Sequence, residues 1–320
     1  MPLSSCSSWM LAWTGGGGGG SFFSLSSRPR LEKDFATARK RVRVNASHHP
    51  CPINTLQRPI QYSPALHPIA CIWPGDAFVS GTIANGGLWD AELAHVMVDH
   101  LRNKPTSLVI DAGCNVGQFS LLAAASGHFV AAIDALHEHA AMVNHAAILN
   151  GFQDRIWVQN VVLAAKDDGK ATVTRDGMSS NMGGITPKLD ARRLQVAHVR
   201  TATLNALLRH HKPSLPVSFF KLDVEGFEPL VLEGAQKWLV ARRPQAIALE
   251  ITPQAWRAHG YNVADVLQGI MDLNYTCARL YGGLKGVPRS ALRSFVQTIE
   301  HLNTVDMVFT HESEASKRPA

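Results

Sequence analysis

The sequence of 320 residues contains few cysteines, and no two of them have the spacing of a Cys-x-x-Cys motif. There are five, at Cys6, Cys51, Cys71, Cys114 and Cys277. An odd number without that spacing indicates neither a disulfide framework nor a zinc ribbon, and it favours a reducing compartment. The 15 histidines form no His-Glu-x-x-His motif, so we predict no metal site. Because a long uninterrupted apolar run is also missing, we expect no membrane-spanning helix.

Excess positive charge is absent from most of the chain. The formal net charge is +6, but residues 1–60 hold eight Lys or Arg and only two Asp or Glu, whereas residues 61–320 hold 23 of each sign. The high isoelectric point therefore belongs to the N-terminal part. It gives no reason to expect a basic groove for nucleic acid, and we expect no nucleic-acid partner.

The first 79 residues lack a regular hydrophobic pattern. Residues 1–47 are rich in Ser and Gly, have no acidic residue before Glu32, and continue into the basic stretch "ARKRVRV". Such a leader is typical of an organelle (plastid or mitochondrial) transit peptide, or of a disordered tail in a cytoplasmic protein, and both alternatives stay open. Residues 48–79 contain six prolines and are interpreted as an irregular linker.

Strands alternate with helices from about residue 80 to residue 312, before a short tail over 313–320. Helical spacing of apolar residues predicts helices at residues 88–101, 137–149 and 263–274 and one that starts at Glu228. Apolar runs predict strands, among them "SLVID", "HFVAAID", "RIWVQNVVL", "VSFFKLDV", "QAIALEI", "YTCARL" and "TVDMVFTH". This alternation predicts an α/β domain over residues 80–312 with a doubly wound, mostly parallel sheet and an antiparallel last strand. Residues 177–200 are expected to be irregular.

A glycine-bearing turn follows the first predicted strand in "VIDAGCNVGQF". Gly113 and Gly117 allow a sharp turn and a close approach to a ligand, but their spacing is not that of the dinucleotide fingerprint G-x-G-x-x-G. Asp134 ends the next strand, where a carboxylate can accept two hydrogen bonds from a ribose. Asp111 suits an ammonium group, with Asn115 between the glycines. The pattern favours S-adenosylmethionine; the alternative is an ordinary turn with a helix-capping Asp.

Three carboxylates follow the apolar run "VSFF" in "KLDVEGFEPLVLEGA". Asp223 or Glu225 is a candidate general base, or a group that orients the acceptor, at the mouth of the fourth strand. Glu228 is expected to be structural, because an acidic residue at a helix start interacts well with the helix dipole. Lys221 lies on the same strand face as Asp223 and can pair with it; a solvated lysine at the strand edge is the alternative.

Further candidates lie at other strand ends and in one loop. Asn160 ends the third strand, where the adenine of the cofactor is expected, and Glu250 ends the fifth. A lid or substrate loop is expected at Ser179, Ser180 and Asn181, although flexibility alone explains that composition too.

Three segments together resemble the FkbM-type family of S-adenosylmethionine-dependent methyltransferases: "VIDAGCNVGQFSLLAA", "NVVLAAKDDGKATV" and "FFKLDVEGFEPLVLEGA". The resemblance covers about residues 80–310. It implies the class I methyltransferase (Rossmann-like) fold, with a seven-stranded sheet in the order 3-2-1-4-5-7-6. It also implies S-adenosylmethionine as cofactor and O-methylation of a hydroxyl on a small molecule, sugar or glycan as the usual activity.

Two positions depart from the family pattern. Asp134-Ala135 replaces the usual Glu-Pro, and Cys114 replaces a common Ala. The shorter acid can still reach a ribose. An NAD(P)-linked oxidoreductase and a catalytically silent binding domain remain alternatives on the same architecture.

Overall fold

The structure is a computed structural model. It describes residues 51–52, 54–74, 76–176, 183–184, 194–209, 211–212 and 214–315. These residues belong to one compact unit, Asn45–Ala320. The predicted leader and the loop at Ser179, Ser180 and Asn181 lie outside the described residues.

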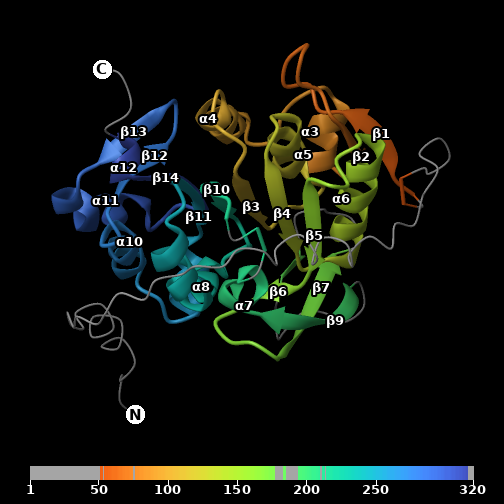
Figure 1. Cartoon of the computed structure of the whole chain (residues 1–320). Coiled ribbons are helices and arrows are strands. Elements are labelled where there is room, and N and C mark those ends of the chain that lie inside the picture. Colours follow the sequence, from red (N-terminus) through yellow and green to blue (C-terminus); the bar gives the residue numbers. More distant parts are fainter. Residues whose placement is uncertain are drawn as a thin grey trace, which may run out of the picture. The chain divides into compact units, whose positions relative to one another are not determined.

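A central sheet of eight strands organises the domain (Figure 1). Across the sheet the strands are β13 (Leu284–Val287), β12 (Tyr275–Leu280), β14 (Val305–His311), β11 (Ala246–Ile251), β10 (Val217–Leu222), β3 (Leu108–Ala112), β4 (Phe129–Asp134) and β5 (Ile156–Asn160). The strands from β11 to β5 are parallel neighbours, whereas β14 is antiparallel to β11 and β12. This confirms the class I order 3-2-1-4-5-7-6 with an antiparallel last strand.

The sheet has one strand more than the seven we expected. A turn at Gly282 and Gly283, whose φ angles are +59° and +93°, reverses the chain after β12 so that β13 pairs antiparallel with it. Glycine tolerates positive φ, which explains why the reversal occurs there. A helix, α11 (Leu292–Ile299), then leads to β14.

Helices cover both faces of the sheet, each over its own apolar core. One core includes Val109 of β3 and involves α4 (Ala91–Leu101), α5 (Gln118–Ala125) and α6 (His137–Leu149). The other includes Leu108 and Ile110 of the same strand. It involves α7 (Leu204–Leu208), α8 (Glu228–Arg242), α9 (Pro253–Ala258), α10 (Val263–Met271) and α11. Successive side chains of a strand point to opposite faces, so both faces of β3 are buried.

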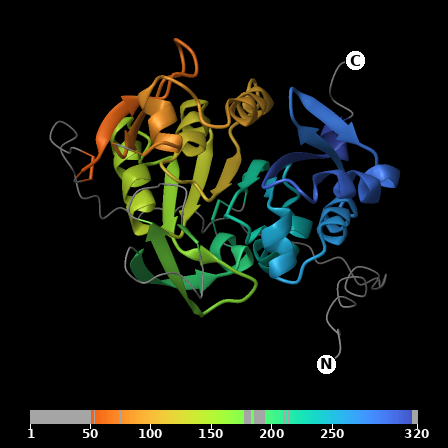
Figure 2. The same cartoon turned by 180° about the vertical axis from the view of Figure 1, so that it is seen from behind.

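A second sheet has the order β6-β9-β7-β8. Its strands are β6 (Val162–Leu163), β9 (Leu194–Ala202), β7 (Lys170–Asp176) and β8 (Gly183–Gly184), and Figure 2 shows β7 beside β9. The run "RIWVQNVVL" was expected to be one strand, but it divides at Val161 between β5 and β6. Residues 194–200 form part of β9, although an irregular segment was predicted there.

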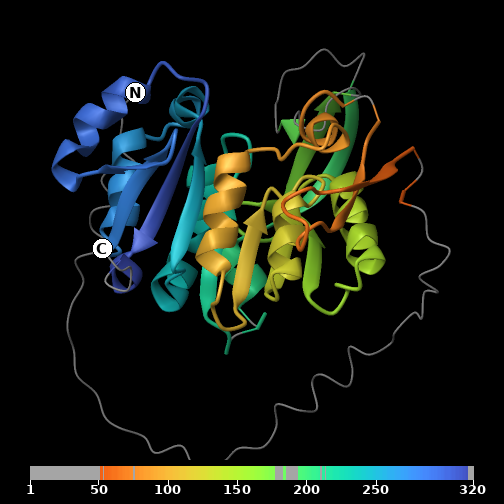
Figure 3. The ribbon, with the colours of Figure 1, turned by 90° about the horizontal axis from the view of Figure 1, so that it is seen from above.

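The predicted linker contains an ordered hairpin. Its strands β1 (Leu56–Pro59) and β2 (Ile69–Ile72) pair antiparallel, and β2 packs against α6 (Figure 3). The side chain of Asn150 accepts a hydrogen bond from Ile69 N (2.8 Å) and donates one to Ile69 O (2.7 Å). The expectation of an irregular segment over 48–79 is therefore wrong for the hairpin, because the prolines still leave Leu56–Pro59 and Ile69–Ile72 able to pair as strands. A short helix, α3 (Val79–Ala84), follows.

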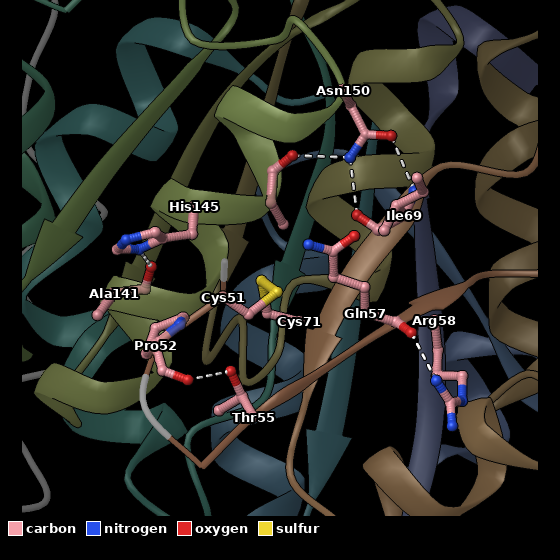
Figure 4. Close-up of a disulfide and its surroundings, with 11 residues drawn as sticks. Cys51, Pro52, Thr55, Gln57, Arg58, Ile69, Cys71, Ala141, His145 and Asn150 are labelled. Atoms are coloured by element: carbon pink, nitrogen blue, oxygen red, sulfur yellow. Dashed lines mark hydrogen bonds between the residues drawn. A yellow bond between two sulfur atoms is a disulfide. The ribbon is translucent and has the colours of Figure 1, made fainter. Parts of the chain in front are cut away.

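A disulfide joins Cys51 to Cys71 beside this hairpin (Figure 4). The sequence predicted no disulfide framework, and for this pair the prediction is wrong. The two cysteines are 20 residues apart and belong to no motif; strand pairing and packing bring them together. Cys114 and Cys277 are buried and unpaired, and Cys6 lies outside the described residues.

Two short helical segments complete the described residues: a 3₁₀ helix at Arg289–Ala291 and α12 (Glu312–Ala315). The helix α12 lies where a tail was expected. Within the described part of the chain, every helix is too short or too polar to cross a membrane.

Candidate active site

A cavity of about 350 Å³ lies at the carboxyl ends of β3, β4, β10 and β11. Its polar lining consists of Asp90, Asn115, Gln118, Asp134, His139, Lys221, Asp223, Glu225, Glu250, Thr304 and Asp306. Its apolar lining includes Phe78, Val79, Trp89, Phe119, Ile133, Leu136, Val161, Val162, Leu163, Val224 and Phe227. In a doubly wound sheet this edge is where ligands bind.

The cavity brings together most of the residues predicted from the sequence. Gly113, Asn115 and Asp134 line it on the side of β3 and β4, and Asp223 and Glu225 line it at the end of β10. Residues far apart in the sequence thus meet at one edge of the sheet, as the parallel arrangement requires.

The glycine turn passes directly against the end of β10. Gly113 has a φ of +79°, and a Cβ atom there would lie 1.6 Å from the carbonyl oxygen of Asp223. The amide of Asp223 donates to the carbonyl of Ala112 (3.1 Å). Glycine is therefore required at position 113, because both the backbone angle and the contact with residue 223 exclude a side chain.

Asp134 is held by three donors from its own surroundings. Its Oδ2 accepts a hydrogen bond from the amide of Asn115 (2.9 Å), and its Oδ1 accepts from the amide of Leu136 (2.8 Å) and from Nδ1 of His139 (3.1 Å). Asn115 has a φ of +50°, which asparagine tolerates better than most residues. The carboxylate is 8% exposed and is fixed in orientation at the cavity wall.

Three predicted ligand residues do not line the cavity. Asp111 is fully buried and accepts a hydrogen bond from Ser120 Oγ (2.5 Å). Gly117 begins α5 with a φ of +87°, and a Cβ atom there would lie 2.8 Å from a methyl group of Val143. Asn160 donates to the carbonyls of Asp134 (3.1 Å) and Ala135 (2.8 Å). Gly117 and Asn160 thus shape the turn and the loop that do line the cavity, whereas Asp111 bonds to α5. Direct binding of the ligand by these three residues stays a prediction.

Lys221 is the lysine of the cavity, and it is 4% exposed. Its Nζ donates to Asp223 Oδ2 (2.8 Å) and to the carbonyl of Gly113 (3.3 Å), and it lies 5.1 Å from the ring centre of Phe119. Burial lowers the pKa of Lys221, but the carboxylates of Asp223 and Asp111 outweigh this effect and raise it above its ordinary value. Lys221 therefore stays charged and occupies one oxygen of Asp223, so that Oδ1 remains for another partner.

The loop after β10 depends on Glu228. This residue is fully buried; its Oε1 accepts from the amides of Val224 (2.8 Å) and Gly226 (3.1 Å), and its Oε2 accepts from Nε1 of Trp256 (2.8 Å). Glu228 thus fixes the loop by direct hydrogen bonds. Glu225, at the centre of this loop, has a φ of +57°, a strained conformation for a residue with a side chain.

Carboxylates crowd one side of the cavity. Oxygens of Asp223, Glu228 and Glu250 lie within 4.8 Å of one another. Glu250 of β11 also lies directly opposite Asp306 of β14 in the register of the two strands. Loss of water and repulsion from Asp223 raise the pKa of Glu225 to about 7 and that of Glu250 to about 10. Glu250, weighed from the sequence as a possible site residue, does line the cavity.

Trp89 and Asp90 form a wall of the cavity that was not predicted from the sequence. Gln118, which is 2% exposed, accepts from the amide of Trp89 (2.9 Å) and donates to its carbonyl (2.7 Å). Asp90 follows with a φ of +44°, and its carboxylate makes no capping hydrogen bond to α4. An acidic residue directly before an amphipathic helix is normally interpreted as an N-cap. For this reason the sequence alone does not indicate that Asp90 lines the cavity. His139, Leu136 and Asp306 were also missed.

Residues 113–277 match the methyltransferase FkbM domain. No curated protein matches the sequence. Similar solved structures include a methyltransferase FkbM from Methylobacillus flagellatus KT, with 13% identity and a TM-score of 0.39 over 64% of this chain and 43% of that chain. An O-methyltransferase from Bacillus cereus in complex with SAH has 14% identity and a TM-score of 0.34 over 68% and 77%. The chain spans less than half of the Methylobacillus structure.

Proposed function

Since the chain belongs to the methyltransferase FkbM family, we propose that it transfers the methyl group of S-adenosylmethionine to a hydroxyl of a small molecule, sugar or glycan. The observation that carries this proposal is a single cavity that joins the glycine turn at Gly113 and the carboxylate of Asp134 to Asp223 and Glu225. Donor-binding and proton-accepting groups thus share one site.

The residues on the β4 side fit the proposed donor. Asp134 offers a carboxylate oxygen to a ribose hydroxyl, and Leu136, Val161 and Val162 provide an apolar wall for the flat adenine ring. The donor would supply an activated methyl group on a sulfonium. The contribution of the protein is then mainly to align the acceptor for an in-line displacement, which is worth several kcal/mol when the reacting atoms are held close.

Asp223 is placed to take the proton of the acceptor hydroxyl. Its Oδ2 is bound to Lys221, so Oδ1 is the atom that would receive the proton. Glu225 is the second candidate, and its pKa of about 7 leaves it partly ionised at neutral pH. Either residue can also orient the hydroxyl without accepting the proton.

The charges of the cavity favour a neutral or cationic acceptor over a nucleic acid. Asp90 and Asp306 add acidic groups to Asp134 and Asp223, whereas Glu250, with a pKa of about 10, is neutral at pH 7. Lys221 is the lysine of the lining and is already paired. A phosphate backbone would be repelled by this wall.

Calorimetric titration tests the class of ligand. We expect S-adenosylmethionine and S-adenosylhomocysteine to bind and NAD not to bind, because the turn lacks the spacing of a pyrophosphate cradle. Binding of NAD without binding of S-adenosylmethionine would favour the oxidoreductase alternative and contradict the proposal.

Labelled methyl transfer tests catalysis. Incubation of a cell extract with methyl-labelled S-adenosylmethionine, followed by mass spectrometry, should reveal a labelled hydroxyl compound. Asp223→Asn or Glu225→Gln should lower the rate by about 10²–10⁴-fold if that residue is the base. Asp99→Asn, an exposed change that removes a surface pair with Arg102, is the matched control. Full activity in both active-site variants would remove these residues from the mechanism, and cofactor binding without any transfer would favour a silent domain.

A further inference from the structure

His139 is a cavity residue to which the function described so far gives no role. It lies in the first turn of α6, is 3% exposed, and lines the cavity beside Asp134. Its ring packs against Trp73, with 5.6 Å between ring centres and 43° between planes. Trp73 follows β2, two residues after the disulfide-bonded Cys71, so the N-terminal hairpin holds the imidazole in place.

The imidazole is a hydrogen-bond donor to Asp134. Nδ1 of His139 lies 3.1 Å from Oδ1 of Asp134, and because a carboxylate can only accept, Nδ1 carries the hydrogen. The Nε2 atom is buried and has no partner among the described residues. A buried polar atom without a hydrogen-bond partner lowers the stability of the folded state. An apolar side chain would therefore be more favourable at this position unless the hydrogen bond to Asp134 has a function.

The bond to His139 limits what Asp134 can still accept. A carboxylate has about four lone-pair positions. The amides of Asn115 and Leu136 and the imidazole of His139 occupy three of them, two on Oδ1 and one on Oδ2. Among the described residues no other donor reaches this carboxylate, which leaves one position, on Oδ2.

We propose that His139 restricts Asp134 to a single hydrogen bond with the ribose of the methyl donor, so that one of the two vicinal hydroxyls is recognised there and the other is not. This inference rests on the proposed function, because it takes the ligand to be S-adenosylmethionine or its product. It changes the expectation from the sequence, in which the carboxylate accepts from both hydroxyls. His139 is then a specificity-determining residue that acts through Asp134.

The test uses S-adenosylhomocysteine and its 2′-deoxy and 3′-deoxy analogues, titrated calorimetrically into the full chain. A hydrogen bond to a charged acceptor is strong enough that one analogue should bind at least about tenfold more weakly than the parent. The other analogue should bind within about twofold of the parent. Equal losses for both analogues, or no loss for either, would overturn the proposal.

The variant His139→Leu identifies the cause. Leucine fills a similar volume but donates no hydrogen bond, so a second position on Asp134 becomes available and both analogues should then lose about tenfold in affinity. His145→Leu is the matched control, because His145 lies on the same helix and is not among the residues that line the cavity. Among the described residues its imidazole bonds to the carbonyl of Ala141 alone (Figure 4). The variant His145→Leu should discriminate between the 2′-deoxy and 3′-deoxy analogues as strongly as the wild type does.

The outcomes separate the two hypotheses. If the wild-type chain does not bind S-adenosylhomocysteine, the proposed function itself fails. If it binds and His139→Leu discriminates between the analogues as strongly as the wild type, only the role of His139 is contradicted. Should His139→Leu fail to fold, the wild-type comparison of the two analogues still decides whether Asp134 accepts one hydroxyl or two.

Discussion

Residues 113 and 223 meet where the turn after β3 crosses the end of β10. The carbonyl of Asp223 occupies the space that a side chain at position 113 would need, and the same aspartate points its carboxylate toward the cavity. The geometry of the donor turn and that of the candidate base are therefore coupled through a backbone contact.

Gly113→Ala should abolish binding of S-adenosylhomocysteine and destabilise the fold by several kcal/mol, because it adds a backbone clash to an unfavourable positive φ. Gly151→Ala is the matched control: its φ is +72°, but no atom lies within 4 Å of the added Cβ. That variant should lose only about 1 kcal/mol. Urea unfolding and calorimetry measure both effects, and a well-folded, ligand-binding Gly113→Ala would show that the turn can move away from β10.

At the scale of elements, the N-terminal hairpin is attached to the domain at several points. The Cys51–Cys71 disulfide closes one end, the side chain of Asn150 bonds both backbone groups of Ile69, and Trp73 packs on His139. The hairpin's own residues lie outside residues 113–277, which match the family, whereas Asn150 and His139 lie inside that range. The hairpin thus supports the donor side of the cavity from a segment that the family match does not include.

Removal of the disulfide should weaken this support. The double variant Cys51→Ser/Cys71→Ser, or reduction of the wild type, should lower stability by about 3 kcal/mol, because a loop of 20 residues is no longer closed in the unfolded chain. Thermal unfolding with and without reductant measures the effect. The double variant is its own control, since reductant should not affect it further. Equal melting temperatures for oxidised and reduced wild type would contradict the prediction.

At the scale of the whole molecule, acidic side chains gather at the carboxyl edge of the sheet, and several of them keep their protons at neutral pH. Burial and mutual repulsion raise the pKa of Glu228 and Asp306 to about 7, and that of Glu250 to about 10. A carboxyl group with a raised pKa binds more protons in the folded than in the unfolded state. Its contribution to stability is present below the unfolded value and is lost as pH rises through the folded value.

Between about pH 7 and 9, Glu250 is the carboxyl group of this set that still lies below its folded pKa, so we expect the free energy of unfolding to fall there by up to about 1.4 kcal/mol per pH unit. The lowered pKa of His211, about 4, acts in the opposite direction but only below the ordinary histidine value, outside this window. Glu250→Gln removes the group with the highest pKa and should flatten the dependence. Urea unfolding across this range is the measurement, and stability that rises with pH in the wild type would contradict the prediction.

Much of the fold and part of the site could be predicted from the sequence. The helix over 137–149 and the main strands of the central sheet are confirmed, because the spacing of apolar residues and buried apolar runs are local properties. The strand order, which is also confirmed, was implied by the resemblance to the family. Gly113, Asn115, Asp134, Asp223 and Glu225 follow strand ends, and parallel strands bring their carboxyl ends to one edge. The sequence is therefore enough to predict that these residues lie close together in the fold.

Other features were decided only by the tertiary structure. Cys51 and Cys71 pair because strands and helices bring them together across 20 residues, and no spacing rule indicates this. Trp89 and the adjacent Asp90 reach the cavity because the buried amide of Gln118 holds the backbone of Trp89. The sequence determined which side chains end the strands, since that depends on neighbours along the chain. How many hydrogen bonds Asp134 can still accept depended on His139 and Asn115, whose contacts exist only after the chain has folded.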